Sequence, residues 1–225
     1  LARLLGMSKG SMHGLLKTLE RGRAVEQDDE HRYVLGPRIY DLAQAYIRRG
    51  GLRRFALPAM RRLATQTGET VFLGQVESDG VRIVDIVEMS SEQSTLRVSA
   101  RRGAHVQLLA GAIGRVVLAS WTPSRREEYL RSRELPHFTE RSITDRDAFL
   151  AAVAETARTG VGEERGEYLA GVNAVAAGIH GLGGELIALM WIVGFSTHFS
   201  DAAMQRASEA LREETKRIAQ ALGSA

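Results

Sequence analysis

The chain has 225 residues, of which 44% are hydrophobic and 25% are charged, a composition that suits one large or two small globular domains. It contains no cysteine, which excludes disulfides, thiolate zinc sites and cysteine nucleophiles. The longest apolar run, residues 186–195, is about half as long as a bilayer crossing requires, so we expect no membrane partner.

The formal net charge of +3 conceals two oppositely charged regions. Residues 1–62 hold 13 lysines and arginines against 6 aspartates and glutamates, a net charge of +7, whereas the remainder holds 17 against 21, a net charge of −4. We therefore expect only the N-terminal part to contact a polyanion such as double-stranded DNA. A solvated arginine-rich surface is the alternative.

The first motif, residues 6–10, reads Gly-Met-Ser-Lys-Gly and has the spacing of a nucleophile elbow, which would make Ser8 the nucleophile of a hydrolase. An elbow requires a strand before the serine, whereas the leucines before Ser8 recur at helical spacing and end at Gly6. Ser8 instead suits the N-cap of a helix that ends at Gly22 and carries one apolar stripe, Met12, Leu15, Leu16 and Leu19. The motif therefore predicts a corner between two helices and no catalytic residue.

After Gly22 the apolar residues alternate about an acidic corner, residues 27–30, and predict a small β-hairpin. Helix, corner, helix and hairpin is the order of a winged helix-turn-helix, whose second helix enters the major groove of DNA. The predicted DNA-binding residues are the start and exposed face of this helix and one basic hairpin residue: Ser8, Lys9, Gly10, Ser11, His13, Lys17 and Arg32. A helix-turn-helix used only for protein contact is the alternative.

Residues 1–39 resemble the DNA-binding half of the IclR family of bacterial transcription regulators. The resemblance rests on the family's helix-turn-helix pattern and the end of its wing, matched by Leu1, Ala2, Gly6, Lys9, Ser11, His13, Leu15, Leu16, Leu19, Glu20, Tyr33, Leu35 and Gly36. Many members carry arginine where this chain has Gly14, which removes a DNA contact and weakens the helix by about 1 kcal/mol relative to alanine. The family's first helix has no counterpart here, and we expect the natural protein to begin before Leu1.

Residues 37–54 have apolar positions at helical spacing and predict a linker helix that ends at Gly50 and Gly51, followed by a second helix near residues 57–68. In the resemblance this segment is an interdomain helix and a dimer contact; a core helix of one continuous domain is the alternative. The predicted organisation is a winged helix-turn-helix at 1–36, a linker helix at 37–56 and an effector-binding domain at 57–225.

The rest of the chain predicts a mixture of strands and helices. We expect strands at 71–77, 81–89 and 95–100, a helix from about residue 109, helices at 123–134 and 145–159, two apolar strands within 172–195, and a last helix capped by Ser200. The economical arrangement is an α+β fold with one central antiparallel sheet flanked by helices.

The resemblance extends through this region, which implies a GAF-like effector-binding domain. One family element is matched by Gly103, Leu108, Ala110, Ala112, Gly114, Arg115, Leu118 and Ala119, and a later one by Glu167, Gly171, Val172, Val175, Ala176 and Ala177. Family members often place polar residues or cysteine where this chain has Leu109, Gly111 and Ala174, so we expect a less polar pocket than usual.

Small residues at the start of the helix near residue 109 leave its first amide N–H groups open, and these groups favour a carboxylate. Apolar strand residues would wall the pocket, with Asn173 or Trp191 as a polar group. The predicted effector-binding residues are Leu108, Leu109, Ala110, Gly111, Ala112, Glu167, Val172, Asn173, Ala174, Met190 and Ile192. Simple packing of the helix on the sheet is the alternative.

Other candidate sites have weaker support. We interpret Glu163, Glu164 and Glu167 as a solvated acidic turn, since no nucleophile stands near them in the sequence. The six histidines are dispersed without the spacing of metal ligands, so we expect neither a metal nor a cofactor. The prediction is a cytoplasmic, homo-oligomeric transcription regulator, a dimer or tetramer, whose operator binding responds to a small carboxylate. A serine hydrolase and a sensor acting only through protein contacts are the alternatives.

Overall fold

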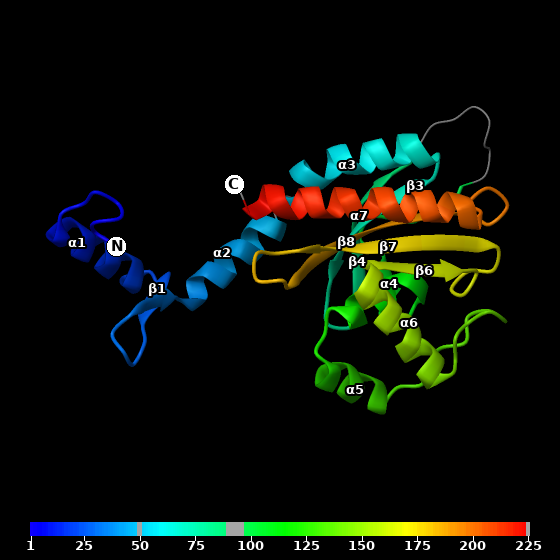
Figure 1. Ribbon diagram of the computed structural model, residues 1–225, viewed down its shortest axis with the longest axis horizontal. Coiled ribbons are helices and arrows are strands. Elements are labelled where there is room, and N and C mark those ends of the chain that lie inside the picture. Colours follow the sequence, from blue (N-terminus) through cyan, green and yellow to red (C-terminus); the bar gives the residue numbers. More distant parts are fainter. Residues whose placement is uncertain (49–50, 89–96, 224–225) are drawn as a thin grey trace. The chain divides into compact units, whose positions relative to one another are not determined.

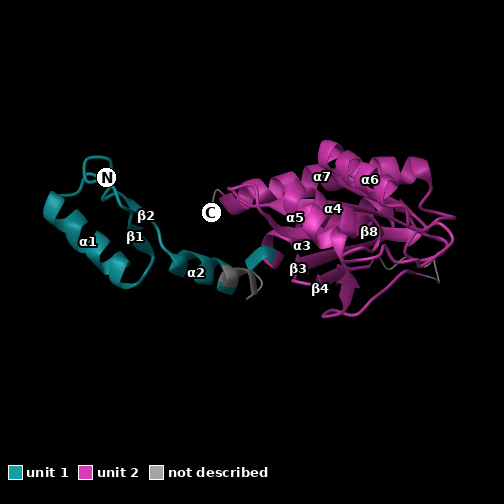
Figure 2. Ribbon diagram, turned by 90° about the horizontal axis from the view of Figure 1, so that it is seen from below, with its two compact units in different colours: residues 1–52 teal, residues 53–225 magenta. Residues whose placement is uncertain are grey.

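The computed structural model describes residues 1–48, 51–88 and 97–223, which form two compact units at 1–52 and 53–225 (Figure 2). The predicted boundaries at 36/37 and 56/57 differ from this division, because the first helix after the hairpin belongs to unit 1 and residue 56 lies inside a longer helix. Three predicted features lie wholly or partly outside the described residues: the helix end at Gly50, the strand end at Met89 and the beginning of the strand at 95–100.

Unit 1 begins with hydrogen-bonded turns and not with a strand. The amide of Leu5 donates to Leu1 O at 3.1 Å, and the amide of Met7 donates to Ala2 O at 3.0 Å. Helix α1 then spans Lys9–Arg21. Ser8 caps it, because its Oγ accepts the N–H of Ser11 at 3.1 Å and so satisfies one of the free amides of the first turn. The predicted cap is confirmed, whereas residues 2–6 form turns where the end of a preceding helix was predicted.

A two-stranded hairpin follows α1. Strand β1, Val25–Gln27, pairs antiparallel with β2, Tyr33–Leu35. The Asp28 side chain closes the turn by accepting the backbone N–H groups of Glu30 and Arg32, as aspartate commonly does in turns. Helix α2, Pro37–Arg48, completes the described part of unit 1 before Gly51. The predicted second helix and the hairpin after it are confirmed, and they are preceded by turns.

Unit 2 contains a six-stranded antiparallel sheet with the strand order β5-β4-β3-β8-β7-β6. Its strands are β3 Thr70–Val76, β4 Gly80–Val87, β5 His105–Gln107, β6 Val161–Arg165, β7 Val172–His180 and β8 Leu186–Phe195. The strand predicted at 95–100 is wrong for its described part, residues 97–100, which have no regular structure. Strand β6 was not predicted, because one valine followed by Gly-Glu-Glu-Arg lacks the alternation of a half-buried strand.

Five helices cover the described sheet: α3 Gly51–Thr67, α4 Gly111–Ala119, α5 Pro123–Arg131, α6 Arg146–Thr159 and α7 Asp201–Gly223. Figure 1 shows α3 and α7 on one side of the sheet and α4, α5 and α6 on the other. Helix α3 starts six residues before the predicted Leu57 and includes Pro58. Helix α6 has the predicted ends, with Asp145 accepting the N–H of Ala148 and left-handed Gly160 after the last turn.

The hydrophobic core of unit 2 follows the alternation of its strands. Phe72, Ile83, Leu189 and Trp191 pack with α4 in one cluster, while their neighbours along each strand point to the other face of the sheet. Helix α4 is buried along almost its whole length, because it lies between this sheet face and α6. Within the described part of the chain, no helix combines the length and apolarity that a membrane crossing requires.

Candidate DNA interface and effector cavity

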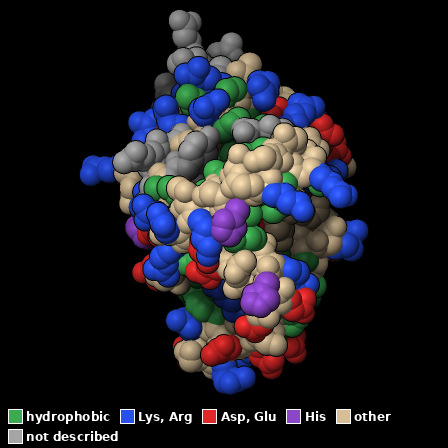
Figure 3. All heavy atoms as spheres, turned by 90° about the vertical axis from the view of Figure 1, so that its left-hand side faces the viewer, with side chains coloured by type: hydrophobic (Ala, Val, Ile, Leu, Met, Phe, Trp, Pro, Cys, Tyr) green, Lys and Arg blue, Asp and Glu red, His purple; other side chains and the backbone are tan. Residues whose placement is uncertain are grey.

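The predicted reading face of α1 is exposed. Lys9, Ser11, His13 and Lys17 all lie on the surface of unit 1, while Met12 between them is buried and holds the helix to its unit. Ser8 is committed to the helix cap. Lysine and arginine side chains are spread over the face of the molecule shown in Figure 3, with acidic side chains among them.

Two carboxylates already bind Arg32, whereas Lys17 of α1 pairs with one, Glu20, at 2.8 Å. The Nε of Arg32 lies 2.9 Å from Asp28 Oδ2, and its Nη1 lies 2.8 Å from Glu30 Oε2. Hydrogen bonds from the backbone and side chain of Arg32 hold the pKa of Asp28 below its usual range. Arg32 must leave these partners before it can contact a phosphate with its full charge.

Unit 2 contains a partly open cavity of about 110 Å³ between the sheet and the start of α4. The residues that line it are almost all apolar, and among the described lining residues Glu164 is the one with a charged side chain: Phe72, Ile83, Val98, Ser99, Ala100, Val106, Ala110, Ala112, Ile113, Glu164, Tyr168, Leu169, Val172, Ala174, Trp191 and Val193. Such a space, apolar with a few polar groups, is the usual character of a small-molecule site.

Four predicted effector residues line this cavity: Ala110, Ala112, Val172 and Ala174. Gly111 stands at its edge with a φ of +44°, which favours glycine, and a β-carbon there would overlap the Glu164 carboxylate unless that side chain moved. Two further predicted residues, Leu108 and Leu109, pack into hydrophobic clusters and do not line the cavity.

The predicted effector-binding residues of β7 and β8 lie on both faces of the sheet, and only one face lines the cavity. Side chains alternate along a strand, so Trp191 and Val193 line the cavity while Met190 and Ile192 point to the opposite face. Asn173 likewise turns away and donates from Nδ2 to Phe199 O at 2.8 Å. Met190, Ile192 and Asn173 therefore do not fit the role of cavity walls in this fold.

Glu164 is the feature that the sequence interpretation missed. It is 5% exposed and not part of a solvated turn, so that interpretation is wrong for this residue. Burial, and after it the nearby Glu167 carboxylate, raise the pKa of Glu164 to about 7, against the opposing effects of the Tyr168 N–H, which donates at 3.1 Å, and of Arg115. Its strand neighbour Glu163 lies on the other side and accepts the Ser208 hydroxyl at 3.0 Å.

Glu167 has a structural partner and does not line the cavity. Its carboxylate pairs with the buried guanidinium of Arg115, which also donates to the carbonyl of Glu163. Arg115 belongs to α4, so this pair ties the helix to the loop after β6. The Nε of Arg115 has no hydrogen-bond partner among the described residues, a cost that the folded state bears and that the pair with Glu167 offsets in part.

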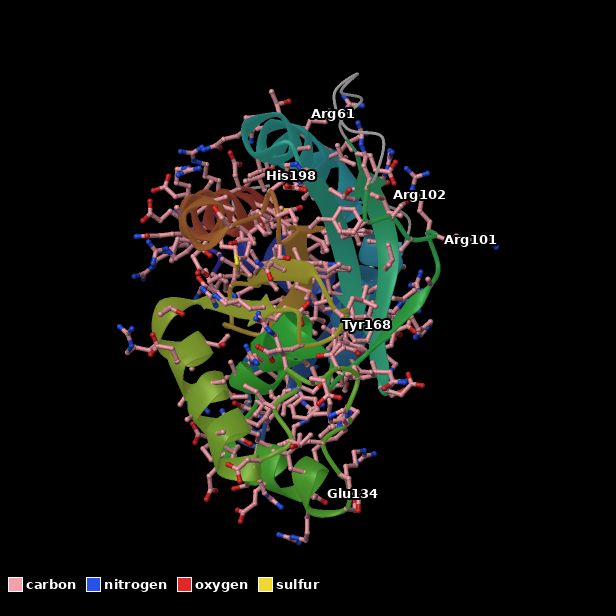
Figure 4. All side chains as sticks on the ribbon, turned by 90° about the vertical axis from the view of Figure 1, so that its right-hand side faces the viewer. Arg61, Arg101, Arg102, Glu134, Tyr168 and His198 are labelled. Atoms are coloured by element: carbon pink, nitrogen blue, oxygen red, sulfur yellow. The ribbon has the colours of Figure 1, made fainter. Side chains whose placement is uncertain are left out.

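Aromatic residues complete the cavity; of these, Trp191 was predicted from the sequence, whereas Phe72 and Tyr168 were not. Phe72 and Trp191 stack with ring centroids 5.2 Å apart and an interplanar angle of 9°. Tyr168, labelled in Figure 4, lines the same space and meets Phe138 edge to face. Alternation along β8 places Trp191 and Val193 on the same face, so a sequence pattern can predict that they lie together. Phe72 joins them only because β3 pairs with β8, which no local pattern indicates.

The two units together define a class of protein. A winged helix-turn-helix with an exposed cationic helix, joined to a sheet-and-helix unit that contains a small apolar cavity, has the parts of a transcription regulator that binds DNA and senses a small molecule.

Family models match both units. The model for the C-terminal domain of the bacterial transcriptional regulator IclR matches residues 44–220, and the model for the IclR helix-turn-helix domain matches residues 1–29. The chain belongs to the IclR family of transcription regulators. It is therefore a DNA-binding regulator with a small-molecule effector domain and not an enzyme, and the serine-hydrolase alternative is not supported.

Known relatives agree with this assignment. The chain is 30% identical to the HTH-type transcriptional regulator BhcR of Paracoccus denitrificans, over 97% of this chain and 77% of the relative. It is 32% identical to the glycerol operon regulatory protein of Streptomyces coelicolor, over 80% and 69% of the two chains. The crystal structure of the Thermotoga maritima IclR protein aligns with a TM-score of 0.70 and 26% identity, over 99% of this chain and 89% of that chain.

Proposed function

We propose that the protein is a cytoplasmic homo-oligomer whose operator binding is modulated by a small organic acid held in the cavity of unit 2. The observation that carries the proposal is the partly open, mostly apolar cavity at the N-terminus of α4. An effector can shift the placement of two DNA-reading modules only by its difference in affinity for the two arrangements.

For the DNA-reading role we propose the exposed start and face of α1, residues Lys9, Gly10, Ser11, His13 and Lys17. The lysines suit phosphate oxygens and would set the salt dependence, whereas Ser11 and His13 carry donors and acceptors that suit base edges. One such module makes few contacts, so a dimer that reads two half-sites is expected to bind much more tightly. Helix α2 exposes Ile39 and Leu42 one turn apart, and we propose this stripe as part of a subunit contact.

The size of the cavity favours a small effector. An engineered cavity of roughly 150 Å³ holds benzene, so a space of about 110 Å³ suits a molecule of about six non-hydrogen atoms or fewer. The first amide N–H groups of α4 have no partner within the helix, and its N-cap residue Ala110 supplies no side-chain cap. These groups and the helix dipole favour an acidic group on the effector.

The test combines DNA binding with a cavity-filling variant. We expect the full chain to bind DNA from upstream of its own gene selectively and with strong salt dependence, in a gel shift against a random duplex of equal length. A library of short organic acids should contain one that changes this affinity. Ala174→Leu, which fills the cavity, should abolish that response while DNA binding without the acid persists; a response that survives Ala174→Leu would place the effector elsewhere.

A further inference from the structure

The effector cavity contains an acid of its own at the point where an acidic effector would bind. The Glu164 carboxylate lies against Gly111, the first residue of α4, so close that a β-carbon on that glycine would overlap it. Its Oε2 accepts the N–H of Tyr168 at 3.1 Å. An effector carboxylate at the start of this helix would therefore lie beside a carboxyl group of the protein.

No cation of the cavity compensates for a second negative charge. The described lining residues include no lysine, arginine or histidine. Arg115, on the same helix as Gly111, is engaged with Glu167 and with the carbonyl of Glu163. The residues that β7 and β8 present to the cavity, such as Val172 and Trp191, carry no acid or base.

Four titratable groups face or surround this position from the elements packed there: Glu164 of β6, Arg115 of α4, and Glu167 and Tyr168 of the loop that follows β6. Two ionised carboxylates in contact within an apolar space are strongly unfavourable, whereas one proton between them gives a short, charge-assisted hydrogen bond. Glu164 is suited to hold that proton, because its surroundings favour the neutral acid.

We infer that the effector binds as a carboxylate together with the uptake of one proton. Glu164 carries this proton and, as the neutral acid, donates a hydrogen bond to the effector carboxylate. The proton comes from solvent and is carried on Glu164; no covalent bond to the effector forms or breaks. The first amide N–H groups of α4 then donate to the carboxylate oxygen of the effector that does not bind Glu164. This inference rests on the proposed function. It predicts that the effector binds more tightly, and the regulator responds more strongly, as the pH falls.

The experiment is isothermal titration calorimetry of the full chain with three probes of matched shape: butyrate, butyramide and n-butylamine. Each titration is performed at pH 6, 7 and 8 in buffers of different ionisation enthalpy, so that the number of protons taken up is measured directly. Butyrate should bind best, with uptake of about one proton at pH 8 and a Kd about tenfold weaker at pH 8 than at pH 6.

Variants separate the proton from simple packing. Glu164→Gln keeps a hydrogen-bond donor at the same place, so butyrate should still bind, but without proton uptake and with the same Kd at pH 6 and pH 8. Glu163→Gln is the matched control, since that carboxylate faces the opposite side of β6, and it should retain the proton uptake of the native protein.

The possible failures are distinguishable. Butyrate binding that is abolished by Ala174→Leu but has the same Kd at pH 6 and pH 8 would overturn the shared proton while leaving the cavity as the effector site. Tighter binding of n-butylamine than of butyrate would do the same. Absence of binding by all three probes would overturn the proposed assignment of effector size and class, and the inference with it.

Discussion

The two units of the molecule use their side chains in opposite ways. Among the described residues, the buried hydrophobic side chains of unit 1 are Met12 and Leu52, while leucines on α1 and around it stay exposed. Unit 2 buries side chains on both faces of a six-stranded sheet. We therefore expect substitutions on the surface of unit 1 to cost its fold little, whereas the residues that line the cavity of unit 2 are also part of its core.

Ion pairs give the sharpest version of this contrast. Lys17 and Glu20 of α1 form an exposed pair at 2.8 Å, whereas Arg115 and Glu167 form a pair that is almost completely buried. We expect Arg115→Met to destabilise unit 2 by about 3–5 kcal/mol, because it leaves the Glu167 carboxylate without its cation in a buried position. Guanidinium denaturation followed by tryptophan fluorescence measures this, since Trp121 and Trp191 both lie in unit 2.

The controls are two exposed pairs. Lys17→Met, followed by far-ultraviolet circular dichroism, and Arg158→Met, which removes the exposed pair with Glu155, should leave the denaturation midpoints unchanged within error. If Arg115→Met changed the denaturation midpoint as little as these two variants, the buried pair would contribute no more to stability than the exposed pairs.

The elements of the fold that the sequence predicted well are those with a strong local signal. The cap at Ser8, the hairpin of unit 1, helix α6 with its Asp145 and Gly160 ends, and the long strands β7 and β8 all follow from patterns within a few residues. Strand β5 has three residues and β6 has one large apolar residue, so neither has a period from which a strand can be recognised.

The cavity was predictable only in part, because its walls come from segments far apart in the chain. The small residues at 110–112 and the apolar strand at 172–174 indicated one side of it. Phe72 and Ile83 join them through strand pairing, which no local pattern reveals. Glu164 was misjudged because its neighbours Glu163 and Arg165 are polar, and only alternation on an edge strand turns it inward.

Glu164 gives the next largest expected effect, and its direction depends on pH. Since the pKa of this carboxyl is raised to about 7 in the folded protein, above its unfolded value, ionisation opposes folding. The stability that the neutral acid confers is full below the unfolded pKa and is lost as the pH rises through the folded pKa, a loss of at most about 3 kcal/mol by pH 8. Glu164→Gln should remove this pH dependence in thermal or guanidinium unfolding between pH 5 and pH 8.

The matched control is Glu69→Gln in the same unit. Burial also raises the pKa of Glu69, but His198 opposes the shift and the residue lies away from the cavity, so Glu164→Gln should have the larger effect. A pH dependence of unfolding that is the same in Glu164→Gln and the native protein would contradict the buried, neutral state of this acid.

The surface of unit 1 is tested by salt dependence rather than stability. Lys9→Ala should lower the slope of log affinity against log salt by about 1, because one phosphate contact is lost. Arg32→Ala should change the slope much less, since Asp28 and Glu30 already neutralise that side chain. Fluorescence anisotropy with a labelled duplex at several salt concentrations measures both slopes; an equal loss for the two variants would mean that Arg32 leaves its carboxylates on DNA.

The smallest expected effect concerns Gly14 in the middle of α1. A β-carbon at this position would meet no atom within 4 Å, and the residue has an ordinary helical φ, so Gly14→Ala should stabilise the helix by up to about 1 kcal/mol. In the full chain this would appear as amide hydrogen exchange in α1 slowed by up to about fivefold. Gly10→Ala, at the start of the same helix, is the control and should have a smaller effect, because the first turn fixes fewer hydrogen bonds. A gain at Gly14 would mean that backbone freedom limits the stability of α1, in contrast to α4, where glycines such as Gly114 are required because the helix packs against backbone.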